Sequence, residues 1–320
     1  ISTFHNLGLT LLRQELRHLG YRPQFSILDA EDSTHLLAEL LRLESGSTPE
    51  TGTLIQTHIS QWKNDLVLPA QALSQAADEA EYRSAQWYER YQQQLRAYNA
   101  FDFDDLILQP VTLLLEQPEV LARWRHKIHY LLVDEYQDTN TAQYRFIQLL
   151  VGDRAAFTAV GDDDQSVYTW RGARPENLQQ LSQDFPTLKV VALEQNYRST
   201  AAILDMANRL LAYNRKRHDK VLRAARPGGE RPRIEQYKDE TEEAKSVAAD
   251  IARRLQDQGV EARDFAILFR TNEQPRAFET ELRKLKLPYF LVGGMSFFDR
   301  KEVRDLLAYL KVLDTPTDEV

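Results

Sequence analysis

Three short apolar runs, each followed by a segment with helical spacing, are the feature that most limits how this chain can fold. The runs are residues 130–133 (YLLV), 155–160 (AAFTAV) and 190–193 (VVAL), and the helical segments after them are 141–150, 175–184 and 200–213. Strands that are apolar throughout and alternate with helices are typical of a parallel sheet covered on both faces. The alternation is expected to resume with strands at 233–237, 265–269 and 289–292 and helices at 240–257, 274–286 and 300–313. The sequence therefore predicts an α/β fold with a domain boundary near residue 190.

Residues 20–100 follow a different pattern. Their apolar residues are spaced mostly by three and four, which indicates helices. This segment ends in an aromatic stripe that consists of Tyr82, Trp87, Tyr88, Tyr91, Leu95 and Tyr98. Packing between helices explains such a stripe better than base stacking does. We therefore predict an all-α subdomain inserted into the α/β fold.

Composition narrows the possible functions. The chain has 320 residues, enough for two or three domains, and no cysteine, which excludes disulfides, thiol nucleophiles and cysteine-based metal sites. It contains no apolar run of the ~18 residues that a membrane span needs, so we expect no membrane partner and a cytoplasmic setting. The net charge is 40 − 48 = −8, yet residues 209–233 carry nine Lys/Arg against two acids. This basic stretch fits either nucleic-acid contact or a solvated helix end and loop.

The apolar run at 131–133 ends in two acids, Asp134 and Glu135. In open α/β sheets, ligands bind beyond the carboxyl ends of the strands. Mg²⁺ on a nucleotide is held by one or two carboxylates with phosphate oxygens and waters, and a second carboxylate can deprotonate the attacking water. Many strands also end in acids that are simply solvated, so the pair alone leaves both interpretations open.

Three longer strings of mostly polar residues make a functional interpretation of the acid pair more specific. They are 134–140 (DEYQDTN), 160–173 (VGDDDQSVYTWRGA) and 193–200 (LEQNYRST). In this order they resemble motifs II, III and IV of the superfamily 1 DNA helicases of the UvrD/PcrA/Rep type, with most similarity to the Rep branch. Further strings that resemble this family are 2–8 (STFHNLG, motif Ib), 101–106 (FDFDDL), 287–289 (LPY) and 293–300 (GGMSFFDR).

The resemblance implies the fold, the domains and the cofactors. It implies RecA-like parallel sheets flanked by helices, as in P-loop NTPases, with ATP and Mg²⁺ bound. Residues 1–19 and 101–189 would belong to the first RecA-like motor domain, 20–100 to the helical insertion, and 190–320 to the start of the second motor domain. The implied partners are single-stranded DNA, single/double-strand junctions and replication or repair proteins, in a cytoplasmic, nucleoid-associated setting.

The resemblance also implies a role for each matching residue. Asp134 would bind Mg²⁺ and Glu135 would act as the general base. Gln165 would sense the γ-phosphate, Arg198 would stabilise charge on the transferring phosphoryl group, and Tyr197 would stack on the adenine. The implied contacts to single-stranded DNA are Thr3, His5, Tyr168, Trp170 and Arg171.

Two clusters of acids have simpler interpretations. Asp162, Asp163 and Asp164 invite a metal site, but three consecutive residues converge on one ion only through an unusual turn, so local capping is expected for at least two of them. Asp102, Asp104 and Asp105 are most simply acids at a helix N-terminus, where they complement the helix dipole.

The sequence leaves two functions open. None of its twelve glycines is followed by lysine, so it holds no Gly-x-x-x-x-Gly-Lys-[Ser/Thr] phosphate loop, and motifs V and VI are also missing. We expect an internal fragment of an ATP-dependent 3′–5′ DNA helicase that is inactive as an ATPase by itself. The alternatives are a non-hydrolysing module that binds nucleic acid or a partner, and a related helicase–nuclease subunit.

Overall fold

The computed structural model describes residues 1–42, 49–214, 218, 220–293 and 301–314. These residues form two compact units. The first contains Ile1–Asn196 and Ala207–Arg223, and the second contains Tyr197–Met206 and Ala224–Asp314. Among the described residues, no helix combines the length and the apolar character that a membrane crossing requires.

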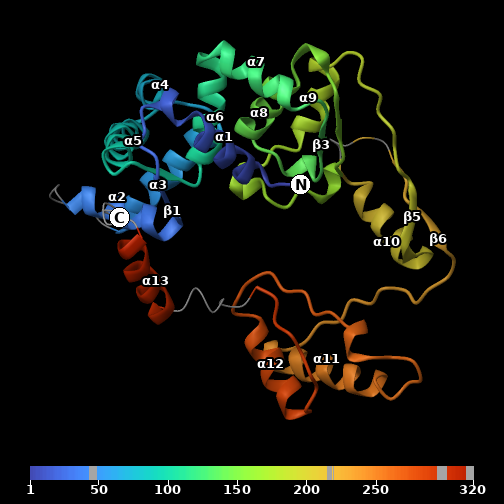
Figure 1. Cartoon of the computed structure of the whole chain (residues 1–320). Helices are drawn as coiled ribbons and strands as arrows, with labels where there is room; N and C mark the ends of the chain where they lie inside the picture. The colour runs from blue at the N-terminus through green and yellow to red at the C-terminus, as the bar shows by residue number, and fades with distance from the viewer. Residues whose placement is uncertain (43–48, 215–217, 219, 294–300, 315–320) are drawn as a thin grey trace. The chain divides into compact units, whose positions relative to one another are not determined.

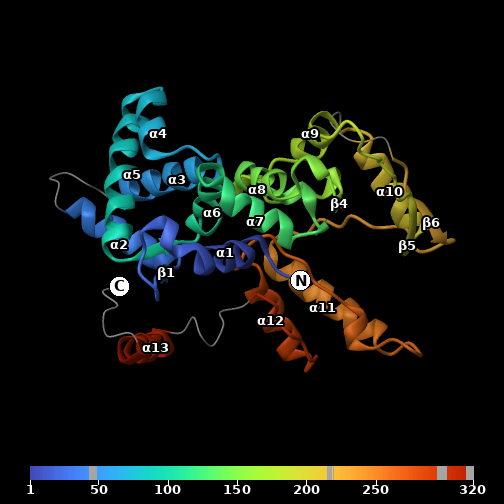
Figure 2. The same ribbon diagram turned by 45° about the horizontal axis from the view of Figure 1, so that its top comes forward.

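One part of the first unit is a group of helices, which we call the helical group (Figures 1 and 2). Its helices are α2 (Ala30–Arg42), α3 (Pro49–Asn64), α4 (Pro69–Gln75) and α5 (Glu79–Ala97). The N-terminus of α5 is fixed by Asp78, whose carboxylate accepts a hydrogen bond from the backbone N–H of Glu81 at 2.8 Å. The predicted packing role of the aromatic stripe is confirmed for Trp87, Tyr88, Tyr91 and Leu95, which are buried in the core of this group; Tyr82 is 48% exposed.

The helical group is joined to the rest of the first unit at a two-stranded parallel sheet. Strand β1 (Ser26–Leu28) pairs with β2 (Ala100–Asp102), with Ile27 opposite Phe101. The segment predicted to be all-helical therefore contains one short strand. Its ladder satisfies backbone groups where the segment begins and ends.

A second group of helices packs beside the first, and we call it the central group (Figure 1). Its members are α1 (Phe4–Leu19), α6 (Asp105–Glu116), α7 (Pro118–Lys127) and α8 (Thr141–Val151). Gly8 of α1 lies against the backbone of α6, because a Cβ at this position would be 1.8 Å from the carbonyl oxygen of Leu106. Only glycine allows these two helices to approach so closely.

The parallel sheet predicted from the apolar runs is present as two strands. Strand β3 (Leu131–Val133) pairs in parallel with β4 (Phe157–Ala159), and α8 and α9 (Glu176–Asp184) supply side chains to the core beside them. Leu132 is 76% exposed, so the expected coverage of both faces is not complete in this structure.

The second unit is mostly helical in the described residues. Its elements are parts of β5 (Gln195–Thr200), α10 (Ala201–Leu211) and β6 (Arg223–Arg226), followed by α11 (Glu240–Arg254), the 3₁₀ turn η5 (Ala262–Asp264), α12 (Pro275–Lys284) and α13 (Lys301–Asp314). Helices α10 to α13 agree with the segments predicted to be helical after residues 193, 237, 269 and 292, as α8 and α9 of the first unit agree with those after 133 and 160. Residues 294–300, part of a string that resembles the family's second motor domain, lie outside the described residues.

Four predicted strands are wrong in this structure. Residues 190–193, 233–237, 265–269 and 289–292 form no strand, and the strand near the third apolar run is β5, which begins at Gln195. Apolar composition favours an extended chain, but a strand also needs a neighbour at hydrogen-bonding distance, which composition does not specify. Leu268 and Phe290 remain 92% and 87% exposed.

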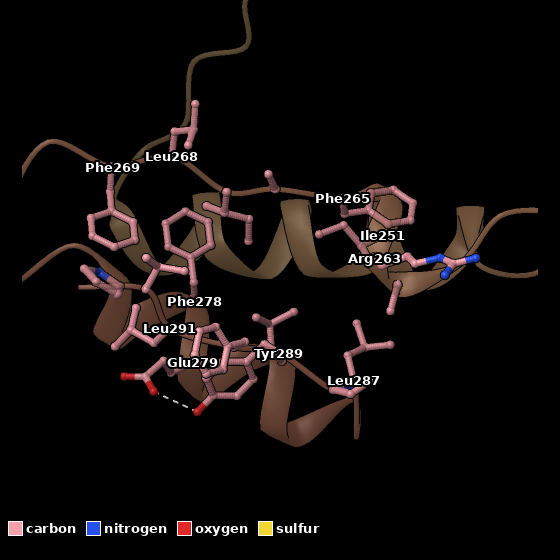
Figure 3. A pocket seen from close by; sticks show the side chains of 18 of the residues that line it. Ile251, Arg263, Phe265, Leu268, Phe269, Phe278, Glu279, Leu287, Tyr289 and Leu291 are labelled. Atoms are coloured by element: carbon pink, nitrogen blue, oxygen red, sulfur yellow. Dashed lines mark hydrogen bonds between the residues drawn. The ribbon is translucent and has the colours of Figure 1, made fainter. Parts of the chain in front are cut away.

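Two of these extended segments line an apolar cavity of about 860 Å³ within the second unit (Figure 3). Helices α11 and α12 and the turn η5 supply further parts of the wall, with Ile251, Phe278 and Arg263 among the lining residues. At one edge the hydroxyl of Tyr289 donates a hydrogen bond to Glu279 at 2.7 Å (Figure 3). The cavity contains none of the residues to which the sequence assigns a function.

Candidate active site

The two acids that follow β3 are exposed at the carboxyl end of the parallel pair. Val133 lies opposite Ala159 in the ladder, so the loops after β3 and β4 leave the sheet at the same edge. Asp134 and Glu135 follow the first strand, and the turn that contains Gln165 follows the second. The structure therefore brings together three of the four predicted catalytic residues on neighbouring loops.

Glu135 has an unusual backbone conformation. Its φ is +50°, in the left-handed region, and its N–H donates to the Oδ1 of Asp134 at 3.0 Å. A residue other than glycine in this region is strained by roughly 1–2 kcal/mol, and such strain is found most often at functional sites. The turn directs both carboxylates away from the core.

A buried glutamine holds the two loops together. The Nε2 of Gln137 donates to the Oε2 of Glu135 at 2.8 Å, and its Oε1 accepts the backbone N–H of Asp162 at 3.0 Å. Its backbone carbonyl accepts the hydroxyl of Ser166 at 3.3 Å. Gln137 is 1% exposed, so solvent does not compete for these bonds. No motif role was predicted for Gln137, although a polar amide two positions after Glu135 is a usable signal in the sequence.

Gly161 makes this contact possible. A Cβ at this position would lie 2.8 Å from the Oε1 of Gln137 and 3.3 Å from the Cβ of Tyr136. The loop after β4 therefore passes close to Gln137 only with glycine at this position.

Gln165 ends a short 3₁₀ turn, η3 (Asp163–Gln165). Its Nε2 donates to the Oδ2 of Asp162 at 2.7 Å, and its backbone N–H donates to the carbonyl of Asp162 at 2.9 Å. Asp162 also caps the turn, because its Oδ1 accepts the N–H of Asp164 at 3.1 Å. The capping role predicted for this acidic string is therefore present at Asp162.

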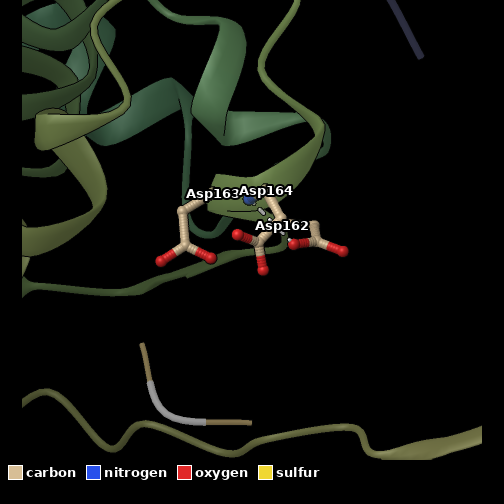
Figure 4. A group of neighbouring side chains, drawn as sticks. All are labelled: Asp162, Asp163 and Asp164. Carbon is tan, nitrogen blue, oxygen red and sulfur yellow. Dashed lines mark hydrogen bonds between the residues drawn. The ribbon is translucent and has the colours of Figure 1, made fainter. Parts of the chain in front are cut away.

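The same turn nevertheless brings all three aspartates together. Each offers a carboxylate oxygen within 4.8 Å of the others, and the three carboxylates lie on one side of the turn (Figure 4). Convergence of three consecutive acids requires an unusual turn, as the sequence predicts, and the 3₁₀ turn η3 supplies it. The ammonium group of Lys220 lies at that point, 2.7 Å from Asp162 and 3.3 Å from Asp164, and it also contacts Asp163.

The ammonium group of Lys220 stabilises the charged form of the aspartates in this turn. Burial raises the pKa of Asp162 and Asp163, but hydrogen bonds and charge from Lys220 outweigh that effect and hold the pKa of each below its usual value. His218 adds a hydrogen bond from its backbone N–H to Asp163 at 2.6 Å. The lysine already supplies a cation to the three carboxylates. This contact was not predicted, although Lys220 lies in the basic stretch at 209–233 that the sequence shows.

The predicted single-strand contacts after η3 are exposed. Tyr168 is 43% and Trp170 64% exposed, and their ring centroids lie 6.5 Å apart. Trp170 belongs to the 3₁₀ turn η4 (Thr169–Arg171). The side chain of Arg171 lies outside the part of the structure that is described. The indole of Trp170 therefore lies largely exposed in a polar loop and is not buried in a core.

Thr3 and His5 lie at the start of α1. Thr3 is the N-cap of this helix, and its hydroxyl accepts the N–H of Asn6 at 3.2 Å. His5 packs on Phe103, with ring centroids 4.7 Å apart, and burial lowers the pKa of its imidazole. His5 is therefore a neutral group at neutral pH, able to donate a hydrogen bond but not to act as a cation.

Tyr197 and Arg198 lie in β5, within the second unit. Both side chains are exposed, Tyr197 by 75%. The backbone carbonyl of Arg198 accepts a hydrogen bond from the guanidinium of Arg226 at 3.0 Å. Strand pairing with β6 thus fixes the backbone of both residues.

Comparison with known proteins identifies the family of the chain. The family model for the UvrD/REP helicase N-terminal domain matches residues 1–186, and the model for the UvrD-like helicase C-terminal domain matches residues 191–320. The chain belongs to the UvrD/Rep helicase family. The resemblance predicted from motifs II, III and IV is therefore confirmed, and membership of this family implies a RecA-like α/β fold.

Individual relatives of this UvrD/Rep-family chain carry helicase names. It is 48% identical over 322 residues to the ATP-dependent DNA helicase Rep of Escherichia coli (strain K12), covering 100% of this chain and 47% of that protein. It is 39% identical over 321 residues to the ATP-dependent DNA helicase PcrA of Staphylococcus aureus (strain Mu50 / ATCC 700699), covering 100% of this chain and 44% of that protein. The chain thus spans about half the length of the curated relatives it matches.

Proposed function

We propose that this chain is part of an ATP-dependent DNA helicase that moves 3′ to 5′ along single-stranded DNA and unwinds duplexes in replication and repair. Family membership and the names of the relatives support this proposal. The observation that carries it is the exposed acid pair after β3, which shares one sheet edge with the Gln165 turn after β4. This is the edge at which open α/β sheets bind nucleotides.

The acid pair fits hydrolysis of a nucleotide. Asp134 offers an exposed carboxylate, the hard oxygen ligand that Mg²⁺ prefers, and would hold the ion that neutralises phosphate charge. Glu135 would accept the proton of the attacking water, and Gln137 fixes one of its oxygens while leaving the carboxylate at the surface.

Three further residues have proposed roles towards ATP. Gln165 would contact the γ-phosphate, Arg198 would stabilise charge on the transferring phosphoryl group, and Tyr197 would stack on the adenine. Exposure of all three side chains supports these assignments, because each is available to a ligand. A planar, permanently charged guanidinium suits the role of Arg198.

The proposed contacts to single-stranded DNA are Tyr168, Trp170 and Arg171, with Thr3 and His5 as contacts to the backbone. The exposed rings of Tyr168 and Trp170 support base stacking. We assign 1–19 and 101–189 to the first motor domain, 20–100 to the helical insertion and 190–320 to the second motor domain. We also propose a cytoplasmic, nucleoid-associated protein that acts on single/double-strand junctions with replication or repair proteins.

The test is the Glu135→Gln variant of the intact protein that contains this chain. The amide keeps the shape of the side chain but cannot accept the proton, so DNA-stimulated ATP turnover should fall by a factor of about 10² or more. Equilibrium binding of a fluorescent ATP analogue should stay within about twofold, since Glu135 is not needed to hold the nucleotide. Glu119→Gln, an exposed acid in α7, is the matched control.

Unchanged turnover in Glu135→Gln would reject the general-base role. Absence of turnover in the unaltered protein, with retained DNA binding, would favour a non-hydrolysing binding module. Nuclease activity alongside unwinding would favour a helicase–nuclease subunit. For residues 1–320 alone, we propose no turnover, because no glycine in the sequence precedes a phosphate-binding lysine.

A further inference from the structure

Four consecutive residues at the C-terminal end of α3 and just after it contact elements outside the helical group. They are Lys63, Asn64, Asp65 and Leu66, and we call them the α3 turn. Their targets include β2 and α6, the segment 139–141 behind the acid pair, and the loop after Trp170. The helical group thus contacts two candidate functional loops through one turn.

The backbone of the α3 turn is held in a strained conformation. Leu66 has a φ of +61°, in the left-handed region. The N–H of Leu66 donates to the carbonyl of Lys63 at 3.2 Å, and the N–H of Val67 donates to that of Trp62 at 2.8 Å, which closes the helix end. Glycine normally occupies such a position, and here the leucine side chain packs against the core of the central group. The strain is maintained by packing across the two groups.

Lys63 anchors the turn. Its ammonium group is fully buried and lies 2.7 Å from the Oδ2 of Asp102 and 3.0 Å from the Oδ1 of Asp105. Burial lowers the pKa of Lys63, but the two carboxylates outweigh this and raise its pKa well above the usual value, so the lysine is charged. Asp102 and Asp105 are therefore counter-ions of a buried lysine, and not simply acids that complement the dipole of α6.

Asn64 connects the anchor to the segment behind the acid pair. Its Nδ2 donates to the Oδ1 of Asp104 at 3.2 Å, and its Oδ1 accepts the Nδ2 of Asn140 at 2.5 Å. Asn140 is also the N-cap of α8 and accepts the N–H of Gln143 at 2.9 Å. A Cβ on Gly172 would lie 3.8 Å from the Cβ of Asn64, so the loop after Trp170 passes directly over this side chain.

Asp65 contacts both loops at once. Its Oδ1 accepts the hydroxyl of Thr141 at 2.9 Å and the Nη2 of Arg174 at 2.6 Å. The backbone N–H of Arg174 donates to the carbonyl of Thr139 at 2.9 Å. The two loops are therefore joined to each other and to one carboxylate from the helical group.

We propose that the α3 turn transmits single-strand binding at Tyr168 and Trp170 to the segment behind Glu135, with Asn64 and Asp65 as positioning residues. This inference rests on the proposed function for the roles of these loops. Arg174 lies four positions after Trp170, and Thr141 lies six positions after Glu135, so both groups are connected to Asp65 through short, hydrogen-bonded backbone. Movement of one loop on DNA binding therefore displaces the support of the other.

The test uses the intact protein with Asp65→Ala, Arg174→Ala and the double variant. Basal turnover without DNA and affinity for single-stranded DNA should each stay within about twofold, because no group that contacts ATP or DNA is removed. The ratio of DNA-stimulated to basal turnover should fall about fivefold or more, the size of an ordinary coupling between sites. Asp65→Ala breaks the contact that Arg174→Ala breaks and also the bond to Thr141, so the double variant should be no worse than Asp65→Ala alone.

Arg253→Ala is the matched control. Arg253 forms a similarly exposed ion pair with Asp250 within α11 of the second unit. This variant should keep the full stimulation ratio. Arg174→Lys, which retains the charge, should restore part of the ratio lost in Arg174→Ala. A ratio unchanged in Asp65→Ala, or additive losses in the double variant, would overturn the proposal.

A second measurement does not depend on catalysis. Amide hydrogen exchange at 172–174 should accelerate in Asp65→Ala and stay unchanged in Arg253→Ala, because the loop loses a tether. Unchanged amide exchange at 172–174 would overturn the positioning role, whatever the ratio of DNA-stimulated to basal turnover. Failure of Glu135→Gln to stop turnover would instead reject the proposed catalytic role, so the two failures are distinguishable.

Discussion

Gln137 joins Glu135 to Asp162 through the two ends of a single buried amide. The Nε2 donates to the Oε2 of Glu135 at 2.8 Å, while the Oε1 accepts the backbone N–H of Asp162 at 3.0 Å. The orientation of the candidate base is thus linked to the loop that carries Gln165. Gln137 has no proposed contact to ATP itself. It nevertheless helps to position Glu135 and the loop that carries Gln165.

Removing this link should reduce turnover without weakening nucleotide binding. In the intact protein, Gln137→Ala should lower kcat for ATP by about tenfold to a hundredfold, because Glu135 loses its orientation, and leave KM within about twofold. Steady-state ATPase assays with saturating single-stranded DNA measure both constants. Gln148→Ala, which removes a half-buried glutamine of α8 that bonds Asp184, is the control. A rise in KM with unchanged kcat would contradict the positioning role.

Trp170 should contribute to DNA affinity through its ring. Trp170→Ala should weaken binding of single-stranded DNA by about 1–3 kcal/mol, which corresponds to the loss of one stacked base. Trp170→Phe keeps an aromatic face and should lose less. Fluorescence anisotropy with a labelled oligonucleotide at fixed salt measures the difference. Equal affinities of the alanine variant and the unaltered protein would show that the indole does not contact a base.

Lys220 should stabilise the acidic turn in a pH-dependent way. Lys220→Ala leaves three neighbouring carboxylates without their cation and should cost about 1–2 kcal/mol of unfolding free energy at pH 7. Asp162 and Asp163 have lowered pKa values in the folded state, so this contribution is present above their unfolded pKa and is lost as the pH falls through the folded values. The difference in Tm from the unaltered protein should therefore stay constant from pH 7 to about pH 5 and shrink as the pH falls below about 4. Lys189→Ala, an exposed lysine, should show no such trend.

The sequence predicts those parts of the structure that depend on local pattern. The helices after residues 140, 174 and 200 follow from apolar spacing, and the strand before Asp134 follows from its continuous apolar run. The exposure of Trp170 follows from the polar residues around it. These features are determined by residues close together in the chain.

Features that depend on distant residues could not be predicted in the same way. Lys63 and Asp102 lie 39 residues apart, and Lys220 lies 57 residues after Asp163, so neither pairing leaves a spacing pattern. Residues 265–269 show the same limit. They were predicted to form a strand, but an apolar run does not specify which strand it would pair with. Gln137 is an intermediate case. Its place after the acid pair can be read from the sequence, but its bond to Asp162 depends on the register of β3 and β4.

Asp104 provides a test of the buried charge near the α3 turn. Burial, and then the charge of Asp102, raises the pKa of Asp104 to about 6, against 3.8 for an ordinary aspartate. Between these values the folded state binds more protons than the unfolded state, so this group makes the protein less stable as the pH rises. Asp104→Asn removes that loss and keeps an oxygen that can accept the hydrogen bond from Asn64. The unfolding free energy of Asp104→Asn relative to the unaltered protein should therefore increase from pH 4.5 to pH 7, as measured by urea unfolding.

Asp153→Asn, which removes an exposed charge in the turn η2 (Gly152–Arg154), is the control and should give a difference that does not change over this range. A constant or falling difference for Asp104→Asn would show that this carboxyl group is ionised in the folded protein throughout the range.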